Sequence, residues 1–348
     1  MSDHIDLVKR AIEFARPARL PLEIVDVPGV YNAYHTLDPQ TVELIPGTED
    51  FDALWTCCYS WQHTVVGKME SGEPIKQDQF GTRLYTPTDL NSAYVLLSHP
   101  LADRSSLEGY RWPDPADADP LFDRLGQVIR TRYADRFVEG FIDAGMFLTA
   151  GLLVGLEDYL YRVAAEPDFA VELYDRVEQY YRQLIPRYKR AGAHMITVIE
   201  DIGGTSSLVM NPAVWRRHFK PITLRFLRAV HEAGLYAGLA IDGHSGDVLD
   251  DVLEMDVDVF TVFDIHTTGL ETIRAKLGGK RCVKAAVDMQ RTLAGGTPAA
   301  VERDAQRLVE AFHTPAGGLI AQVVRWHRPE FPRENVLASV RAFNRYRR

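Results

Sequence analysis

The sequence predicts an α/β protein with a (β/α)8 barrel, formed by one domain over residues 1–348. Short apolar runs of strand character alternate with amphipathic runs of helix character, an order typical of a parallel sheet covered by helices. Consecutive strand-like runs end in acidic, imidazole or guanidinium side chains, as expected at the carboxyl ends of barrel strands. The first strand is followed by no glycine-rich phosphate turn, which would have favoured the competing doubly wound open sheet.

The alternation is clearest in the second half of the chain. Asn211-Pro212 opens a helix there, because Asn caps free N–H groups and Pro needs no N–H partner in the first turn. Gly234 gives that helix a suitable end. The five strand–helix units are 195–199 with 211–234, 235–241 with 248–255, 257–263 with 270–277, 282–287 with 297–312, and 318–324 with 332–346.

The first half repeats this pattern less regularly. Strands are expected at 20–27 and 137–141, helices at 121–133, 152–163 and 169–184, and an extra strand at 54–60. The alternation over 81–97, with a turn at Pro87-Thr88-Asp89, predicts an antiparallel hairpin. We therefore interpret the segment of about 40–125 as an elaboration inserted after the first strand.

The charge and cysteine content exclude several classes of protein. The chain has 39 basic and 48 acidic side chains, a formal charge of −9, and no concentrated basic face for nucleic acid. Cys57, Cys58 and Cys282 form no spacing pattern, which favours a reducing compartment. Without a signal layout or an apolar run near the ~18 residues of a membrane span, a cytoplasmic protein with no membrane partner is expected.

Candidate site residues follow the predicted strand ends. Neighbouring barrel strands lie about 5 Å apart and open at one mouth, so side chains from distant parts of the chain would share a pocket. The expected catalytic residues are Glu200, Asp242, His244 and Asp288. The residues expected to bind substrate are Asp264, His266, Arg291, Arg325 and His327, with Trp61 of the elaboration as a lid residue.

Structural roles are the alternative for these residues. Asp242 and His244 flank Gly243 and could form a tight turn, with His244 capping the helix that follows. Of Glu200 and Asp201, one is expected to face the mouth and the other to anchor the loop. A role in holding a loop or the core is also open for Asp264, His266, Asp288 and Trp61.

The imidazole and carboxylate groups could also hold a metal ion. Zinc or another divalent ion accepts such ligands, and His244, Asp242 and Glu200 are the candidate set. The chain contains no His-x-His and no closely spaced Cys/His set, so a metal is not the favoured interpretation.

Several segments resemble the uroporphyrinogen decarboxylase superfamily, which includes the decarboxylase and corrinoid-dependent methyltransferases. They occur in family order over about residues 75–345. The matching segments are Gln79-Phe80-Gly81, His99-Pro100-Leu101-Ala102-Asp103, Glu200-Asp201-Ile202-Gly203, Asn211-Pro212 with Trp215, His231-Glu232-Ala233-Gly234, Ser245-Gly246-Asp247-Val248, Asp288-Met289-Gln290-Arg291-Thr292-Leu293 and Pro332-Arg333-Glu334-Asn335. The resemblance implies a (β/α)8 barrel, in agreement with the alternation.

The chain departs from both branches of that superfamily. Where family methyltransferases carry a His-x-Cys-Gly zinc motif, this chain reads Gly243-His244-Ser245-Gly246, and no cysteine lies near Arg325 to supply a further thiolate. The decarboxylase has an N-terminal Arg-rich motif that grips substrate carboxylates, and residues 20–34 contain nothing like it. A tetrapyrrole with eight carboxylates would also meet an acidic mouth.

The resemblance implies first a methyltransferase-type enzyme that acts on a small methylated substrate or on a methylcorrinoid carried by a corrinoid protein. The alternatives are a decarboxylase or related lyase that holds a carboxylate with Arg325 and Arg291, a metal-dependent hydrolase, and a barrel that binds a small molecule without catalysis. The assembly stays open, with a homodimer among the options.

Overall fold

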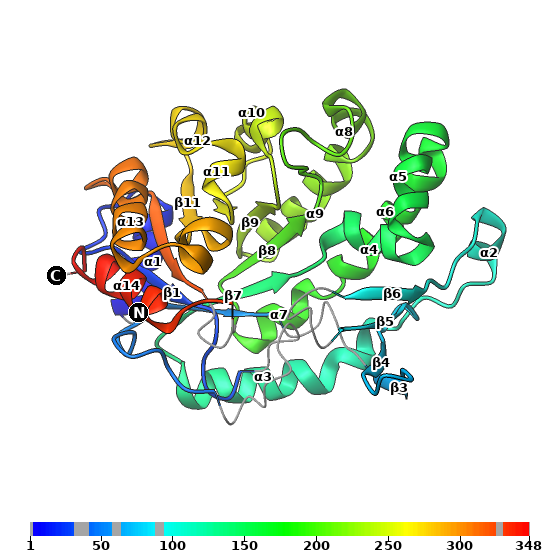
Figure 1. The fold of residues 1–348 in the computed structure, drawn as a ribbon, viewed down its shortest axis with the longest axis horizontal. Coiled ribbons are helices and arrows are strands. Elements are labelled where there is room, and N and C mark those ends of the chain that lie inside the picture. The colour runs from blue at the N-terminus through cyan, green and yellow to red at the C-terminus, as the bar shows by residue number, and fades with distance from the viewer. Residues whose placement is uncertain (1–2, 31–41, 58–63, 88–93, 325–329, 348) are drawn as a thin grey trace.

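A closed ring of eight parallel strands forms the centre of the protein, so the predicted (β/α)8 barrel is confirmed (Figure 1). The computed structural model describes residues 3–30, 42–57, 64–87, 94–324 and 330–347. The order around the ring is β1-β12-β11-β10-β9-β8-β7-β2. The ring strands are β1 (Leu22–Ile24), β2 (Ala53–Thr56), β7 (Phe137–Ile142), β8 (Met195–Glu200), β9 (Tyr236–Ile241), β10 (Val259–Val262), β11 (Cys282–Ala285) and β12 (Leu319–Val323).

Helices follow the ring strands and cover the outside of the ring (Figure 1). The first are α1 (Asp3–Ile12), α2 (Arg104–Glu108), η1 (Pro115–Ala118), α3 (Asp119–Arg132), α4 (Gly145–Val154), α5 (Leu156–Ala165), α6 (Pro167–Arg182) and α7 (Ile185–Ala191). The others are α8 (Pro212–His218), α9 (Lys220–Glu232), η2 (Gly246–Val248), α10 (Leu249–Glu254), α11 (Ile265–Thr268), α12 (Leu270–Leu277), η3 (Met289–Leu293), α13 (Pro298–Phe312) and α14 (Arg333–Asn344). Among the described helices, none combines the length and apolar character needed to cross a membrane.

Two helices occupy the place of the single helix predicted over 211–234. The predicted start is confirmed, since Asn211 Oδ1 accepts from the Ala213 N–H at 2.8 Å. The helix is interrupted at Phe219, between α8 and α9, because Pro221 has no N–H to continue the ladder of hydrogen bonds.

The elaboration contains a four-stranded antiparallel sheet in the order β3-β4-β5-β6, beside the ring in Figure 1. Its strands are β3 (Thr64–Lys68), β4 (Pro74–Gln77), β5 (Arg83–Tyr85) and β6 (Val95–Ser98). The pairing of Tyr85 with Val95 confirms the predicted hairpin, although Thr88 and Asp89 of its turn lie outside the described residues. The interpretation of 54–60 as an extra strand was wrong, because β2 is a strand of the ring between β1 and β7.

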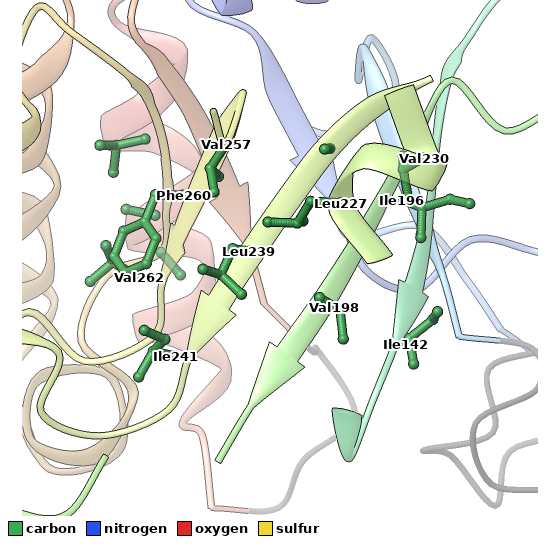
Figure 2. Packing of buried hydrophobic residues seen from close by; sticks show 14 of the residues in the cluster. Ile142, Ile196, Val198, Leu227, Val230, Leu239, Ile241, Val257, Phe260 and Val262 are labelled. Carbon is green, nitrogen blue, oxygen red and sulfur yellow. The ribbon is translucent and has the colours of Figure 1, made fainter. Parts of the chain in front are cut away.

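The main apolar core lies between the ring and its helices. Outward-facing side chains of four neighbouring strands and of α9 fill this layer in Figure 2. The residues labelled there are Ile142, Ile196, Val198, Leu227, Val230, Leu239, Ile241, Val257, Phe260 and Val262. Because the ring strands are buried on both faces, their sequences are mostly apolar, as in β9.

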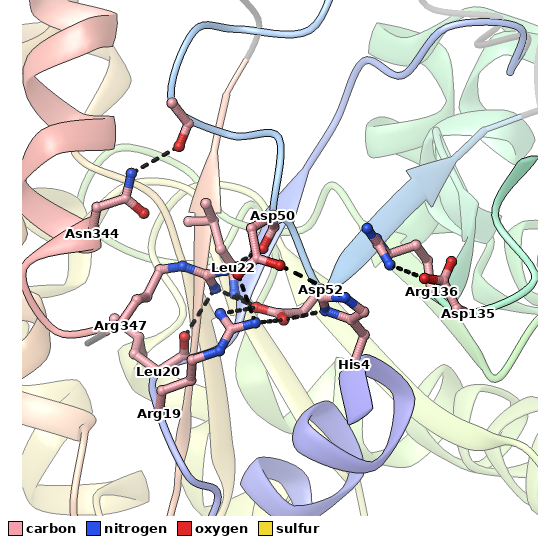
Figure 3. A network of polar contacts seen from close by, with 11 residues as sticks. His4, Arg19, Leu20, Leu22, Asp50, Asp52, Asp135, Arg136, Asn344 and Arg347 are labelled. Atoms are coloured by element: carbon pink, nitrogen blue, oxygen red, sulfur yellow. Dashed lines mark hydrogen bonds and ion pairs between the residues drawn. The ribbon is translucent and has the colours of Figure 1, made fainter. Parts of the chain in front are cut away.

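A polar network joins the two ends of the chain at the amino-terminal face of the barrel (Figure 3). Asp52, buried just before β2, accepts from Arg19 Nη2 at 2.7 Å and from the Leu22 N–H at 2.9 Å. Its carboxylate also pairs with Arg347 and lies 2.9 Å from His4 Nδ1. Groups at this face of a barrel serve stability, so the functional site is sought at the opposite end.

Candidate active site at the barrel mouth

A cavity of about 510 Å³ opens at the carboxyl ends of the strands. Its apolar lining consists of Val25, Trp55, Phe141, Ile199, Phe263, Met289, Ala294, Val324 and Phe331. Its polar lining consists of Asp143, Asp242, Asp264, Gln290, Gln322 and Glu330. A second hollow, of about 130 Å³, lies at the opposite end beside Ile12 and Cys282, and it is too small for a substrate of ordinary size.

Aromatic side chains form the floor of the cavity. The rings of Trp55 and Phe141 lie with centroids 4.7 Å apart, and Phe263 meets Phe141 edge-on at 6.2 Å. Trp55, Phe141 and Phe263 come from β2, β7 and the end of β10 and belong to one cluster above the barrel interior. Sequence reasoning missed this floor, because Trp55 and Phe141 lie inside predicted strands, where a buried aromatic side chain is expected as part of the core.

Aspartates from three neighbouring strands form an acidic rim. Asp143 follows β7, Asp201 follows β8 and Asp242 follows β9. Burial, with the nearby charges of Asp242 and Asp143, raises the pKa of Asp201 well above its usual value. Partial removal from water raises the pKa of Asp242, and the charge of Asp264 adds to this rise. A hydrogen bond from the Gly243 N–H opposes it. The rim therefore concentrates negative charge and favours retention of a proton on Asp201.

Asp143 was missing from the predicted site. The predicted strand 137–141 stopped before it, whereas β7 continues to Ile142 and places Asp143 at the mouth. The pKa of Tyr94, next to β6, is raised by burial and then by the charges of Asp201 and Asp143, so Tyr94 lies within electrostatic range of this rim. Trp61, the expected lid residue of the elaboration, lies outside the described residues, so its role stays a prediction.

Asp264 and Asp288 form a carboxyl pair beside the cavity. Asp264 Oδ1 accepts from the His266 N–H at 2.8 Å, and Asp288 Oδ1 accepts from the Arg291 N–H at 2.7 Å. Burial raises the pKa of Asp288, and contact with Asp264 adds to this effect. Burial alone would raise the pKa of Asp264, but hydrogen bonds, first from the Thr267 hydroxyl, lower it. Both residues cap short helices, as the structural alternative proposed, and Asp264 also lines the cavity.

The structure does not bring Glu200 to the cavity. Ile199 lines the cavity, and successive side chains of a strand point to opposite faces, so Glu200 points outward and Asp201 inward. The Phe147 N–H of α4 donates to Glu200 Oε2 at 3.2 Å. Burial raises the pKa of Glu200 to about 8, opposed by hydrogen bonds from Tyr174 and from backbone N–H groups. Of the two neighbours, Asp201 is the one that points toward the mouth, near Asp143 and Asp242, although it is not itself among the residues that line the cavity.

Three of the predicted cationic and imidazole residues, His244, His266 and Arg291, are not among the described residues that line the cavity. His244 Nδ1 lies 3.2 Å from the Thr267 carbonyl oxygen, and His266 Nε2 lies 3.9 Å from Asp304 of α13. Arg291 is exposed on η3. Arg325 and His327 lie outside the described residues, so their expected contact with substrate stays a prediction.

The described residues do not fit the zinc site that the superfamily implies. Within the described ranges, no three His, Cys, Asp or Glu side chains converge as metal ligands, and His244, Asp242 and Glu200 point to different surroundings. Ser245, at the expected thiolate position, is buried and its N–H donates to Thr268 Oγ1 at 2.8 Å. A divalent metal stays a prediction, and no chemical step is assigned to one.

A buried charged cluster lies in the barrel interior beneath the floor. Lys284 Nζ pairs with Glu139 and lies 3.3 Å from Glu23 Oε2, and Gln322 Nε2 donates to Glu23 at 2.7 Å. Burial, followed by the charge of Glu139, raises the pKa of Glu23 well above its usual value. Burial alone would lower the pKa of Lys284, but the charges of Glu139 and Glu23 raise it. Because Gln322 also lines the cavity, the cluster supports the floor from below.

Comparisons with known proteins agree with this architecture. A family model described as uroporphyrinogen decarboxylase (URO-D) matches residues 78–346. A methyltransferase from Methanosarcina mazei is similar in structure, with a TM-score of 0.63 and 18% identity over 77% of this chain and 76% of that chain. No curated protein matches the sequence.

Two further solved structures share less of the architecture. A B12-independent methionine synthase from a Shewanella species, in complex with selenomethionine, gives a TM-score of 0.43 at 11% identity over 77% of this chain and 76% of that chain. A phosphonopyruvate hydrolase in complex with oxalate and Mg++ gives 0.44 at 10% identity over 99% and 85%.

Proposed function

Because the chain belongs to the uroporphyrinogen decarboxylase family, we propose that it is a methyltransferase-type enzyme that acts on a small methylated substrate in the cavity at the barrel mouth. The resemblance predicted from the sequence is confirmed at the level of the family. The Methanosarcina methyltransferase shares the fold and supports this branch of the family by analogy. The cavity volume also suits a small molecule.

The charge of the cavity lining carries the choice of methyl transfer over decarboxylation of a polycarboxylate. The described lining contains the four carboxyl groups of Asp143, Asp242, Asp264 and Glu330, and no described lining residue is Lys, Arg or His. A substrate with several carboxylates would be repelled by such a lining, because like charges interact strongly where protein excludes water. A neutral or cationic substrate would not be repelled by these described lining residues.

Asp201, Asp143 and Asp242 would do the chemical work of the site. In methyl transfer, the bond between the methyl carbon and its heteroatom breaks, the electron pair stays on the heteroatom, and a lone pair of the acceptor forms the new bond. Asp201, which tends to keep its proton, would supply that proton to a basic leaving group as a general acid. Asp143 and Asp242 line the cavity and would orient the substrate.

A methyl-transfer assay tests the proposal. The purified protein is mixed with methylcobalamin and a panel of thiol and amine acceptors, or with reduced cobalamin and a panel of methyl donors, and the corrinoid spectrum is followed. We expect a change that depends on the protein, slowed at least about tenfold by Asp201→Asn. Asp250→Asn is the matched control, because Asp250 is exposed and pairs with Lys276. An unchanged spectrum with every donor and acceptor contradicts the proposal.

Decarboxylation of a small carboxylic acid is the second candidate, favoured by the description of the matching family itself. A proton held on Asp201 could then be delivered to the carbanion that loss of carbon dioxide leaves. Release of labelled carbon dioxide from a panel of small mono- and dicarboxylic acids, together with an inactive methyl-transfer assay, would favour this candidate.

A further inference from the structure

We infer that the substrate is a small organic cation that carries its methyl groups on nitrogen or sulfur, held between the aromatic floor and the acidic rim of the cavity. This substrate class deepens the proposed function, on which its methyl-transfer step rests. Its binding step rests only on the cavity.

The aromatic floor offers the face that an alkylated cation prefers. The electron-rich faces of Trp, Tyr and Phe attract cations within about 6 Å of the ring centroid, and such rings form the cages that bind quaternary ammonium groups. Trp55 and Phe141 are tilted by 60° to each other, and Phe141 and Phe263 by 78°. The rings pack against one another at these angles and all three line the cavity, so a cation that rests on the floor would lie against an aromatic surface.

The acidic rim supplies the opposite charge. Asp143 and Asp242 both line the cavity, and their charges act on the neighbouring Asp201. Carboxylates gathered in this way destabilise one another until a cation or a proton enters the group. A bound cation would therefore gain from the whole rim, whereas a neutral molecule of the same shape would gain only from the floor.

The buried lysine below the floor does not cancel this preference. Lys284 Nζ lies 5.6 Å from the centroid of Phe141, but it is completely buried and is not part of the cavity lining. It pairs with Glu139 and Glu23, and the side chain of Gln322 lies between this cluster and the cavity. Its charge is thus compensated before it reaches the substrate.

Methyl transfer from such a cation needs one co-reactant, a nucleophilic acceptor such as a thiolate or a reduced corrinoid, and no oxidant or reductant. The bond between the methyl carbon and the positive nitrogen or sulfur breaks, and the electron pair neutralises that atom. The acceptor's lone pair forms the new bond. A neutral amine product then takes a proton from Asp201, which leaves a carboxylate at the rim.

Isothermal titration calorimetry with two matched probes tests the binding step. Choline carries a trimethylammonium group, and 3,3-dimethyl-1-butanol is its neutral isostere with carbon in place of nitrogen. We expect choline to bind at least about tenfold more tightly than the neutral isostere, because both the aromatic rings of the floor and the carboxylates of the rim attract its positive charge. Equal affinity for the two probes, no binding of either, or tighter binding of the anion 3,3-dimethylbutanoate would each overturn the inference.

Two variants assign the preference to the cavity. Asp242→Asn removes one exposed rim charge and should weaken choline several-fold while leaving the neutral isostere unchanged. Phe263→Leu removes a ring of the floor and should also weaken choline more than the isostere. Asp250→Asn, away from the cavity, should change neither affinity. If both cavity variants bind choline as the unmodified protein does, the inference fails.

The two assays distinguish failure of the cation inference from failure of the proposed function. If the protein does not prefer choline over its neutral isostere, but consumes neutral methyl donors in the methyl-transfer assay, the inference of a cationic substrate is wrong and the proposed function stands. If choline binds as expected but no donor is consumed, the cationic site stands and methyl transfer is wrong.

Discussion

Replacement of Lys284 by Met tests whether the charged cluster beneath the cavity is a unit whose members depend on one another. Lys284 and Glu139 are completely buried and Glu23 is 1% exposed, so none of the three can exchange its partner for water. Met preserves the length and much of the volume of the side chain. Glu139 would then keep a buried carboxylate without its cation, and its Oε1 already has no hydrogen-bond partner among the described residues.

The expected cost is large and can be expressed as a shift in melting temperature. Removal of one partner from a buried ion pair costs about 3–5 kcal/mol, because the other charge is left buried. With an unfolding entropy of ~2.1 cal/mol/K for each of 348 residues, about 0.7 kcal/mol/K in total, this corresponds to a fall of about 4–7 °C. Thermal unfolding followed by circular dichroism, with urea unfolding at pH 7, measures it.

Two controls separate the buried charge from the substitution itself. The double variant Lys284→Met/Glu139→Gln should recover most of the lost stability, because it removes the carboxylate that pairs directly with Lys284. The one carboxyl group of the cluster that remains is Glu23, whose pKa is already raised well above its usual value and which keeps the hydrogen bond from Gln322. Lys276→Met removes an exposed pair with Asp250 and should cost about 1 kcal/mol or less. A single Lys284→Met variant that melts within about 1 °C of the unmodified protein, or a double variant no better than the single one, would refute the reasoning.

Three further predictions follow from the placement of other residues. The stability of Glu200→Gln relative to the unmodified protein should rise by about 1.4 kcal/mol per pH unit from about pH 4.5 to 8. In this range Glu200 keeps its proton in the folded protein, where its pKa is raised to about 8, but loses it in the unfolded chain. Urea unfolding between pH 5 and 9 measures this difference, and a difference independent of pH contradicts the assignment. His244→Ala should change kcat in the methyl-transfer assay by less than about threefold, because His244 is outside the cavity lining. Asp242→Asn, which alters a lining residue, should raise KM. Abolished turnover in His244→Ala would show that the imidazole reaches the substrate. Gly145→Ala should prevent folding to soluble protein, because the added Cβ would lie 1.5 Å from the Ile199 carbonyl oxygen, at a residue with a φ of 53°. Gly72→Ala is the control, since no atom lies within 4 Å of its added Cβ, and it should cost only about 1 kcal/mol. Equal yields and melting temperatures of the two variants would contradict the close approach of α4 to β8.

The sequence was sufficient to predict the barrel because alternation repeats in every strand–helix unit. Strands that are buried on both faces need apolar residues throughout, and helices on the outside need only one apolar face, so the two kinds of segment differ in length and pattern. The same reasoning was weaker near β2. Its four residues are too few to show a pattern, and the antiparallel sheet that follows resembles a continuation of it.

The candidate site was predicted less completely, because the position of a residue after a strand does not say which way its side chain points. Asp242 and Asp264 do line the cavity. His244 follows the same strand as Asp242 but turns toward the Thr267 carbonyl. A tight turn at Gly243, with a φ of 79°, redirects the chain between the two residues. Such a turn is visible in the sequence as a glycine, but its geometry depends on the approach of Gly203 from the neighbouring loop.

The orientation of Glu200 and Asp201 could have been decided from the sequence by a different observation. In a strand buried on both faces, apolar residues do not distinguish the helix side from the barrel interior. A polar residue within the strand does, because a polar side chain finds partners in the interior layer of a barrel more readily than against packed helices. Glu139 of β7 lies in that interior layer, and the residue four positions later on the same face is Asp143. Thr197 of β8 takes the same place in its strand, and four positions later lies Asp201, not Glu200. Counting from the lone polar residue of each predicted strand, 137–141 and 195–199, therefore selects Asp143 and Asp201 of the acidic rim. A direct comparison of the methyl-transfer rates of Asp201→Asn and Glu200→Gln would show whether that selection is also the catalytic one.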